Sequence, residues 1–306
     1  MTDTLYRPLG RIVDEYVHWA KNPKARIGTG YSILDARTSG GIAQGEMLMF
    51  LARSGVGKTT MALNFVANNR SRPVVFFSLE MHARYIAQKL AAVAYDVSTA
   101  NIESDIRNTG RSVYLDQLQS DFPMTAIVDE PGMGFKEMGR ALDEIRAEWG
   151  TPPQLVLIDF LELVGGVNSL EAMGQVDKAA RKAKDFARNH DIALVVLHQV
   201  GRGAGGQGHL PLTETSGRFG GEVSADYIMG AFRPHLEPEL TQRDQEALQG
   251  QIWLQFLKTR GGHETHREGM RHNINPASMR ITERNPTHWS SQGYTETELE
   301  LAGVGA

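Results

Sequence analysis

A glycine-rich run in the first quarter of the chain has the residue types and spacing that bind phosphates. It reads Ala-Arg-Ser-Gly-Val-Gly-Lys-Thr-Thr from Ala52 to Thr60, after an apolar run and before a stretch of helical character. In such a P-loop the backbone N–H groups surround the phosphates, the lysine reaches the β- and γ-phosphates, and the hydroxyl after it binds magnesium. The first glycine of the general pattern is Ala52 here, but the Gly-Lys-Thr end is intact. We therefore predict a site for ATP and Mg²⁺ formed by Arg53, Ser54, Gly55, Val56, Gly57, Lys58, Thr59 and Thr60.

Two acidic residues stand where other apolar runs end. Asp159 closes the run from Leu155, and Glu80 follows the run Val74 to Ser78. An acid at the end of a buried strand normally holds the magnesium of such a site, so Thr59 and Asp159 are the predicted metal ligands. Glu80 could orient or deprotonate the attacking water at the carboxyl edge of a sheet. By position alone it could equally be a glutamate at a helix N-terminus, where the helix dipole favours acids.

Short apolar runs alternate with helical stretches along the chain, which is typical of an α/β fold with a mostly parallel, twisted sheet flanked by helices. Most of the runs are nearly continuous in Val, Ile, Leu or Phe, as expected for strands covered on both faces. The predicted strands are Met47 to Ala52, Val74 to Ser78, Thr125 to Asp129, Leu155 to Asp159, Ile192 to His198, Tyr227 to Phe232 and Ile252 to Leu257. The predicted helices are Thr59 to Asn68, Met81 to Ala94, Lys136 to Trp149 and Leu170 to His190, with a separate amphipathic helix from Leu5 to Lys21.

The composition excludes several classes of protein. At 306 residues, with 41% hydrophobic and 22% charged residues, the chain can bury a large core. It contains no cysteine, which excludes thiolate catalysis and cysteine-ligated metal. The formal charge of −4 argues against a basic coat that grips nucleic acid everywhere, so any DNA contact must be local. No apolar stretch is long enough for a membrane span, and we expect a cytoplasmic protein with no membrane partner.

Several stretches, in this order, resemble the C-terminal motor domain of DnaB-type replicative helicases, which are RecA-like ring ATPases. The resemblance spans roughly residues 27 to 265, and it accounts for the Ala-Arg start of the phosphate loop. The matching stretches are Thr29 to Asp35, Ala52 to Thr60, Phe77 to Met81, Ile158 to Leu163, Leu197 to Arg202, Thr215 to Gly217 and Lys258 to Gly262. The domains it implies are a linker helix at residues 1–25, a RecA-like ATPase motor at 26–285 and a flexible tail at 286–306.

The resemblance assigns roles to residues in the nucleotide site. Glu80 becomes the catalytic base, Lys58 contacts the transferred phosphate, and Gln199 senses the γ-phosphate. Lys258 and Arg260 would reach the nucleotide of an adjacent subunit and stabilise charge on the transferred group. Without a neighbour, these two cations would be ordinary solvated surface charges.

The resemblance also places the stretch from Gly201 to Gly217 in a central channel, where it would hold single-stranded DNA. The DNA-binding residues it implies are Arg202, Thr215, Ser216 and Gly217. The family usually has Asp-Leu-Arg-Glu-Ser-Gly at Leu212 to Gly217, so an acid, Glu214, replaces an arginine of that pattern.

Partners follow from the same resemblance. We expect a homo-oligomeric ring, most simply a hexamer, that acts with a primase or a loader. Family members usually carry an N-terminal collar that binds primase, whereas only about twenty residues precede the core here. The helix from Leu5 to Lys21 matches the linker helix that docks on the next subunit, so we expect it to hold the ring together.

Other interpretations of the sequence stay open. A RecA- or RadA-like recombination ATPase shares the sheet and the phosphate loop, a scaffolding ring could bind nucleotide without hydrolysis, and a loader ATPase need not unwind DNA. The basic run at Lys178, Arg181, Lys182, Lys184 and Arg188 is expected to be a solvated helix face. His263-Glu264-Thr265-His266 is one residue short of a zinc-binding spacing and is expected to be a polar turn.

Overall fold

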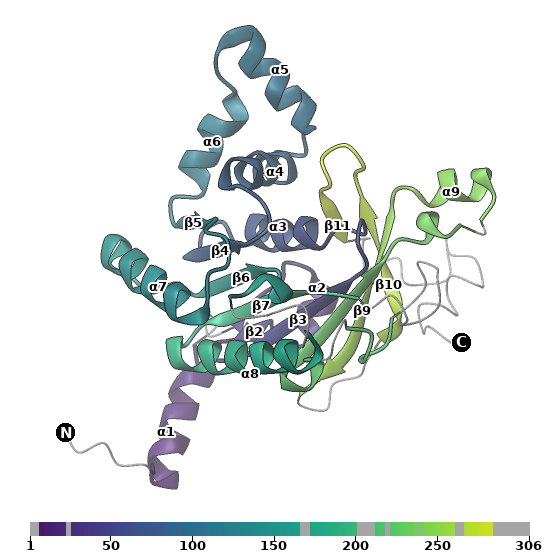
Figure 1. Ribbon diagram of the computed structural model, residues 1–306. Coiled ribbons are helices and arrows are strands. Elements are labelled where there is room, and N and C mark those ends of the chain that lie inside the picture. Colours follow the sequence, from purple (N-terminus) through teal and green to yellow (C-terminus); the bar gives the residue numbers. More distant parts are fainter. Residues whose placement is uncertain are drawn as a thin grey trace.

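The fold is built on a single large sheet, described by a computed structural model of the chain. The structure describes residues 6–22, 26–165, 172–200, 212–217, 221–238, 240–260 and 266–283. Nine strands pair in the order β11-β10-β9-β8-β3-β7-β6-β4-β5 (Figure 1). From β8 to β5 neighbouring strands are parallel, and the β8–β9, β9–β10 and β10–β11 pairs are antiparallel. The predicted α/β class with a mostly parallel sheet is confirmed.

The strands of the large sheet, in chain order, are β3 (Met47–Ala52), β4 (Val74–Ser78), β5 (Thr125–Val128), β6 (Leu155–Asp159), β7 (Ala193–Gln199), β8 (Tyr227–Phe232), β9 (Gln251–Thr259), β10 (His266–Ile274) and β11 (Ile281–Glu283). A two-stranded ribbon, β1 (Arg26–Ile27) and β2 (Ile42–Ala43), precedes them. The longer helices are α1 (Leu9–Ala20), α3 (Lys58–Asn68), α4 (Ala83–Tyr95), α5 (Thr99–Thr109), α6 (Val113–Asp121), α7 (Phe135–Trp149) and α8 (Ala172–His190). Shorter helical segments are α2 (Ser32–Ala36), α9 (Gln242–Leu248), η1 (Leu161–Leu163), η3 (Glu222–Ser224) and η4 (Pro234–Leu236).

Helices cover both faces of the sheet, which explains why its strands are apolar without interruption. Helices α3 and α4 lie on one face, and α7 and α8 lie on the other (Figure 1). Along β3 the side chains alternate between the two resulting cores: Leu48 and Phe50 pack with α3 and α4, whereas Met49 and Leu51 pack with α8. Both cores exclude water, so every position of β3 is buried.

Four elements, α5, α6, β10 and β11, were not among the helices and strands predicted from the sequence. Helices α5 and α6 are mostly polar and lie at the edge of the fold, where Ser98 caps α5 by accepting a hydrogen bond from the Asn101 N–H. Strands β10 and β11 carry many polar residues, because they form the outer antiparallel end of the sheet. The polar turn expected at His263 to His266 is wrong for His266, because this residue begins strand β10. His263 to Thr265 lie outside the described residues.

One buried amide helps to hold the β10–β11 hairpin against the phosphate-loop helix. Asn64 of α3 is fully buried; its Nδ2 donates to the carbonyl oxygens of Thr60 (2.9 Å) and Met279 (3.0 Å). Its Oδ1 accepts a hydrogen bond from the Ile281 N–H at 2.9 Å. The last described strands are therefore fixed to the helix that follows the phosphate loop.

Helix α1 projects from the body of the molecule (Figure 1), and none of its residues is buried. Its apolar side chains face solvent; Leu9 is 75% exposed and Tyr16 is 63% exposed. One contact with the body is a stacking of the Arg26 guanidinium on the Trp19 ring, 5.2 Å from its centroid. Within the described residues, no helix is long and apolar enough to cross a membrane.

Candidate functional site

The phosphate loop connects the central strand β3 to helix α3. Strand β3 ends at Ala52 and α3 begins at Lys58, so the backbone N–H groups of the first helical turn face the loop. Gly55 and Gly57 have φ angles of +81° and +112°, which side chains other than glycine rarely tolerate. The backbone therefore has the geometry expected for a loop that surrounds phosphates.

A cavity of about 310 Å³ opens at this loop and brings together residues from distant parts of the chain. Strand pairing explains the convergence: Ala52 pairs with Gln199, and Ser78 pairs with Asp159, so these strand ends share one edge of the sheet. The lining residues are Ser54, Gly55, Gly57, Lys58, Thr59, Thr60, Glu80, Met81, Lys89, Phe160, Gln199 and Met279.

Two predicted loop residues do not line this cavity. The Val56 side chain is 1% exposed and packs in the core beside α3, so only its backbone can meet a nucleotide. Arg53 lies at the end of β3, where burial lowers the pKa of its guanidinium. The pattern of residue types indicated the loop correctly, but it did not separate backbone contributions from side-chain contributions.

Thr59 and Asp159 are in direct contact. The Thr59 hydroxyl donates to Asp159 Oδ2 at 2.6 Å, and burial raises the pKa of the Asp159 carboxyl to about 6. Its other oxygen, Oδ1, is buried and has no hydrogen-bond partner within the described part of the chain. A hydroxyl and a carboxylate with a free oxygen are hard ligands of the kind Mg²⁺ prefers, so the pair fits a magnesium ion.

Lys58 stands in the same cavity among acids. Its ammonium donates weakly to the Ala52 carbonyl oxygen at 3.4 Å, which leaves donors available for phosphate. Burial lowers the pKa of Lys58, whereas the charges of Glu162, Asp159 and Glu80 oppose that shift. An incoming triphosphate would relieve the cost of this buried cation.

Glu80 follows β4 and lies at the mouth of the cavity, exposed to solvent. Helix α4 begins only at Ala83, so Glu80 precedes the helix and does not belong to its first turn.

Two residues near the nucleotide cavity were not predicted from the sequence. Glu162 accepts a hydrogen bond from the Gln199 N–H at 3.0 Å and lies 3.2 Å from Nδ1 of the buried His198. It thereby fixes the end of β7 where Gln199 stands. Its place three residues after Asp159 was the available signal. Lys89 of α4 also lines the cavity, and no local sequence motif indicated this position.

Lys258 and Arg260 lie at the opposite edge of the sheet. Thr259 pairs with Tyr227 at the start of β8, and the Arg260 guanidinium bonds Asp226 Oδ1 at 2.7 Å. Asp226 in turn accepts from the N–H of Met47, the first residue of β3. The six residues of β3 span about 20 Å, so the Arg260 side chain of one chain stands a strand's length from its own phosphate loop.

The residues predicted to contact DNA lie in a tightly packed segment. Ser216 is 1% exposed, and its hydroxyl accepts from the Thr213 N–H at 2.8 Å. The Gly217 N–H donates to Glu222 Oε1 at 2.6 Å, and any side chain at Gly217 would collide with His198 and Glu222. Thr215 alone of the described three is exposed, and Arg202 lies outside the described residues.

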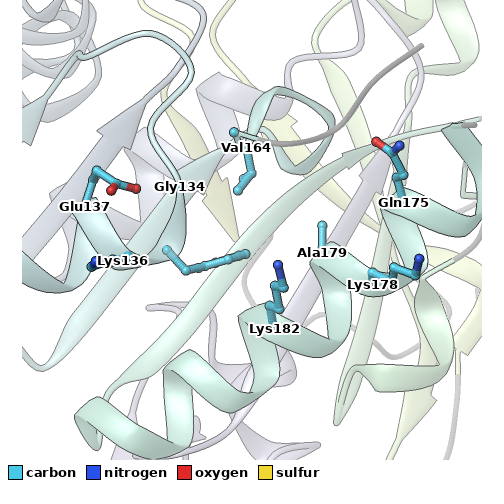
Figure 2. A pocket seen from close by; sticks show the side chains of 10 residues that line it. Gly134, Lys136, Glu137, Val164, Gln175, Lys178, Ala179 and Lys182 are labelled. Carbon is cyan, nitrogen blue, oxygen red and sulfur yellow. The ribbon is translucent and has the colours of Figure 1, made fainter. Parts of the chain in front are cut away.

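A second hollow, of about 440 Å³, lies between α7 and α8 (Figure 2). Figure 2 shows Lys178 and Lys182 of α8 across this hollow from Lys136 of α7. Lys178 and Lys182 are exposed, as expected for a solvated basic face. The expectation is wrong for Lys184, which is half-buried and bonds the Gly45 carbonyl oxygen (2.7 Å) and Asp226 (2.5 Å). The run of basic residues on α8 therefore divides between an open surface and an internal ion pair.

Comparison with known proteins agrees with this fold. Residues 26–270 match the model of the family described as DnaB-like helicase C terminal domain. The replicative DNA helicase DnaB of Treponema pallidum is 31% identical over 221 residues, which cover 70% of this chain and 49% of that protein. The replicative DNA helicase DnaC of Bacillus subtilis is 27% identical, over 62% of this chain and 42% of that protein. The chain thus spans about half the length of these relatives.

Solved structures share the fold at low sequence identity. The ATPase domain of G40P superposes with a TM-score of 0.74 at 18% identity and covers 91% of this chain and 99% of that one. A DnaB-like replicative helicase studied with primase gives a TM-score of 0.73, also at 18% identity, over 90% of this chain and 68% of that one. The RecA-like P-loop fold is confirmed, and the chain belongs to the DnaB-like helicase C terminal domain family.

Proposed function

We propose that this protein is the ATP-hydrolysing motor of a replicative DNA helicase that works as a ring on single-stranded DNA. The observation that carries the proposal is the position of the catalytic groups at opposite edges of one sheet. Lys58, Thr59 and Glu80 surround a cavity at one edge, and Arg260 lies a strand's length away at the other. A complete site then requires two copies of the chain, which a ring of identical subunits supplies.

Each group has a chemical task in this site. Lys58 and the loop N–H groups bind the β- and γ-phosphates, and Thr59 and Asp159 hold magnesium, which neutralises developing charge when bound. Glu80 orients the attacking water and takes its proton. Gln199, fixed by Glu162, stands where it can sense the γ-phosphate, and Arg260 and Lys258 of the adjacent subunit stabilise the transferred group.

Helix α1 supports the assembly. Its apolar face is open to solvent, which is costly unless another surface covers it. We propose that α1 docks on the next subunit of a hexameric ring. We also propose that this ring acts together with a loader or a primase. Deletion of residues 1–22 should convert rings to smaller species in sedimentation experiments, while nucleotide binding by the isolated motor persists. Rings that survive the deletion would show that α1 does not hold the subunits together.

Single-stranded DNA would pass near the segment that ends at Gly217. The exposed Thr215 is better placed for phosphate contacts than its described neighbours, because Ser216 is buried and the N–H groups of Ser216 and Gly217 already bond the Thr213 carbonyl oxygen and Glu222. Binding of this kind depends little on base identity.

The test is ATP hydrolysis with and without single-stranded DNA, together with unwinding of a forked duplex. Lys58→Ala and Arg260→Ala should each lose most of their hydrolysis when tested alone, and their mixture should recover part of the activity, because intact sites form where one supplies the loop and the other the arginine. No recovery would refute the shared site. Hydrolysis without unwinding would point to a loader, and strand exchange on filaments would point to a recombination ATPase.

A further inference from the structure

The aspartate beside Arg260 is held more firmly than a surface ion pair requires. The Asp226 side chain is 3% exposed, and Oδ2 accepts from the Met47 N–H at 2.8 Å and from the Lys184 ammonium at 2.5 Å. Lys184 is itself fixed by the Gly45 carbonyl oxygen at 2.7 Å. Asp226 Oδ2 is therefore committed to the start of β3 and to α8, and it leaves Oδ1 as the oxygen that faces Arg260.

Arg260 has the opposite character. Its side chain is 65% exposed, and Nη1 donates to Asp226 Oδ1 at 2.7 Å. A guanidinium has five N–H donors, so this one bond leaves others for a second partner. Lys184 already neutralises Asp226, so the group of three retains one positive charge, and that charge is carried by the exposed member.

A long arginine side chain on a surface normally samples many rotamers. A hydrogen bond from one guanidinium nitrogen to the rigid Asp226 carboxylate restricts that sampling and leaves the other N–H groups of the guanidinium accessible. Since a misplacement of about 1 Å can cost about 100-fold in rate, a group that must meet a phosphate on another subunit gains from such a restraint.

We propose that Asp226, supported by Lys184, is a positioning residue that aims Arg260 at the nucleotide of the adjacent subunit. Asp226 acts through Arg260 and does not touch the reacting atoms. The inference rests on the proposed sharing of the site between subunits, and it adds that each subunit preorganises its arginine before it meets a neighbour.

Asp226→Asn is the sharpest variant. The amide oxygen can still accept from Met47 and Lys184, whereas the amide NH₂ cannot accept from Arg260. We expect a loss of about 10- to 100-fold in kcat, the range typical when a partner that orients a functional group is removed. Binding of ATP and Mg²⁺ should stay within about 2-fold, because the phosphate loop is untouched. Asp177→Asn is the matched control: it breaks an exposed pair with Arg181 on α8 (2.9 Å) and should leave kcat unchanged.

Mixed rings decide whether the defect lies on the arginine side of the site. Asp226→Asn mixed with Lys58→Ala should recover activity, as Arg260→Ala mixed with Lys58→Ala does, whereas Asp226→Asn mixed with Arg260→Ala should not. In the double variant Asp226→Asn/Arg260→Ala, kcat should equal that of Arg260→Ala alone.

Three results would overturn the proposal. One is recovery with Arg260→Ala, which would place Asp226 on the loop side of the site. Another is an additive loss in the double variant, which indicates a general structural role. If Arg260→Ala and Lys58→Ala themselves fail to complement, the shared site is wrong and this inference falls with it. Should Asp226→Asn not fold, Asp226→Glu, which keeps the charge and displaces Oδ1, takes its place in every mixture.

Discussion

The two edges of the sheet present opposite chemistry. At the carboxyl edge, Asp159 has a buried oxygen without a hydrogen-bond partner in the described residues, and Lys58 stands among three acids whose charges act on it. At the amino edge, Arg260 is bonded to an acid and still exposed, and Val223, whose carbonyl oxygen accepts a hydrogen bond from Lys258, is 81% exposed. In the proposed shared site, nucleotide and metal would complete the carboxyl edge, here named the receiving edge, whereas the amino edge would be offered to an adjacent subunit.

This difference teaches how one chain can make a two-part site. The parallel strands β3, β6 and β7 bring the phosphate loop, Asp159 and Gln199 together at their carboxyl ends, as parallel sheets generally do with the residues that follow their strands. Strand β9 runs antiparallel to β8, so its end delivers Lys258 and Arg260 to the other edge. In the proposed shared site, the reversal of this one strand would separate the half that binds nucleotide from the half that supplies the arginine.

Glu80→Gln should produce a large loss of hydrolysis at the receiving edge without a loss of nucleotide binding. The amide can hydrogen-bond a water molecule but cannot take its proton, so kcat should fall by about 100- to 10,000-fold, which is the usual contribution of a general base. Single-turnover hydrolysis and binding of a fluorescent ATP analogue measure the two properties separately. Binding should persist, in contrast to Lys58→Ala, because Glu80 lies at the mouth of the cavity.

The control for Glu80 is Glu148→Gln, an exposed acid at the end of α7. It should leave hydrolysis unchanged. An active Glu80→Gln protein would remove Glu80 from the chemistry and return it to a role at the start of α4.

The strands and the phosphate loop could be predicted because their signals are local. Strands β3, β4, β6 and β8 have the predicted bounds, since buried parallel strands are continuous in apolar residues and end at turns. Lys58, Thr59, Glu80 and Gln199 each follow such a run or open a helix, so sequence order placed them at one edge.

The residues that were missed are polar groups with distant partners. Asn64 meets Met279 across 215 positions, and Asp226 meets Lys184 across 42. Their types fit a solvated surface equally well, and only packing shows that they are buried. Lys184 was misjudged for this reason, because four neighbouring basic residues on α8 suggested a solvated face.

Asp159→Asn tests whether the buried, ionised carboxylate of Asp159 lowers the free energy of unfolding when no metal is bound. The pKa of Asp159 is raised from 3.8 to about 6, so its favourable protonated state is fully present below pH 4 and is lost as the pH rises through 6. At pH 8 the ionised group costs about 3 kcal/mol of folding free energy. Without nucleotide or magnesium, Asp159→Asn should therefore raise the free energy of unfolding at pH 8 by up to that amount and change little at pH 4, while it abolishes magnesium-dependent hydrolysis.

Asp129, which follows β5 on the same sheet, is the matched control. Its carboxylate accepts from the Ala83 N–H at 2.7 Å, and this bond lowers its pKa. Asp129→Asn should therefore weaken the protein at neutral pH, and its difference from the wild type should shrink in acid. Urea denaturation at several pH values measures the free energy of unfolding of both variants. A loss of stability in Asp159→Asn at pH 8 would contradict the expectation that ionised Asp159 destabilises the protein.

The smallest expected effect concerns the connection between the two edges. The chain returns from β9 through β10 and β11 to the phosphate-loop helix, and Asn64 holds it there with two hydrogen bonds. Asn64→Ala leaves the Met279 carbonyl and the Ile281 N–H without this partner, which should cost about 1 to 3 kcal/mol of stability. Because Met279 lines the nucleotide cavity, KM for ATP should also rise by a few-fold while kcat is retained. Asn108→Ala, which removes an exposed amide bonded to Ser104, should change neither quantity. An Asn64→Ala protein of normal stability would mean that the other contacts of the hairpin, such as the hydrogen bond from Arg280 to Asn68 at 3.0 Å, are enough to anchor it.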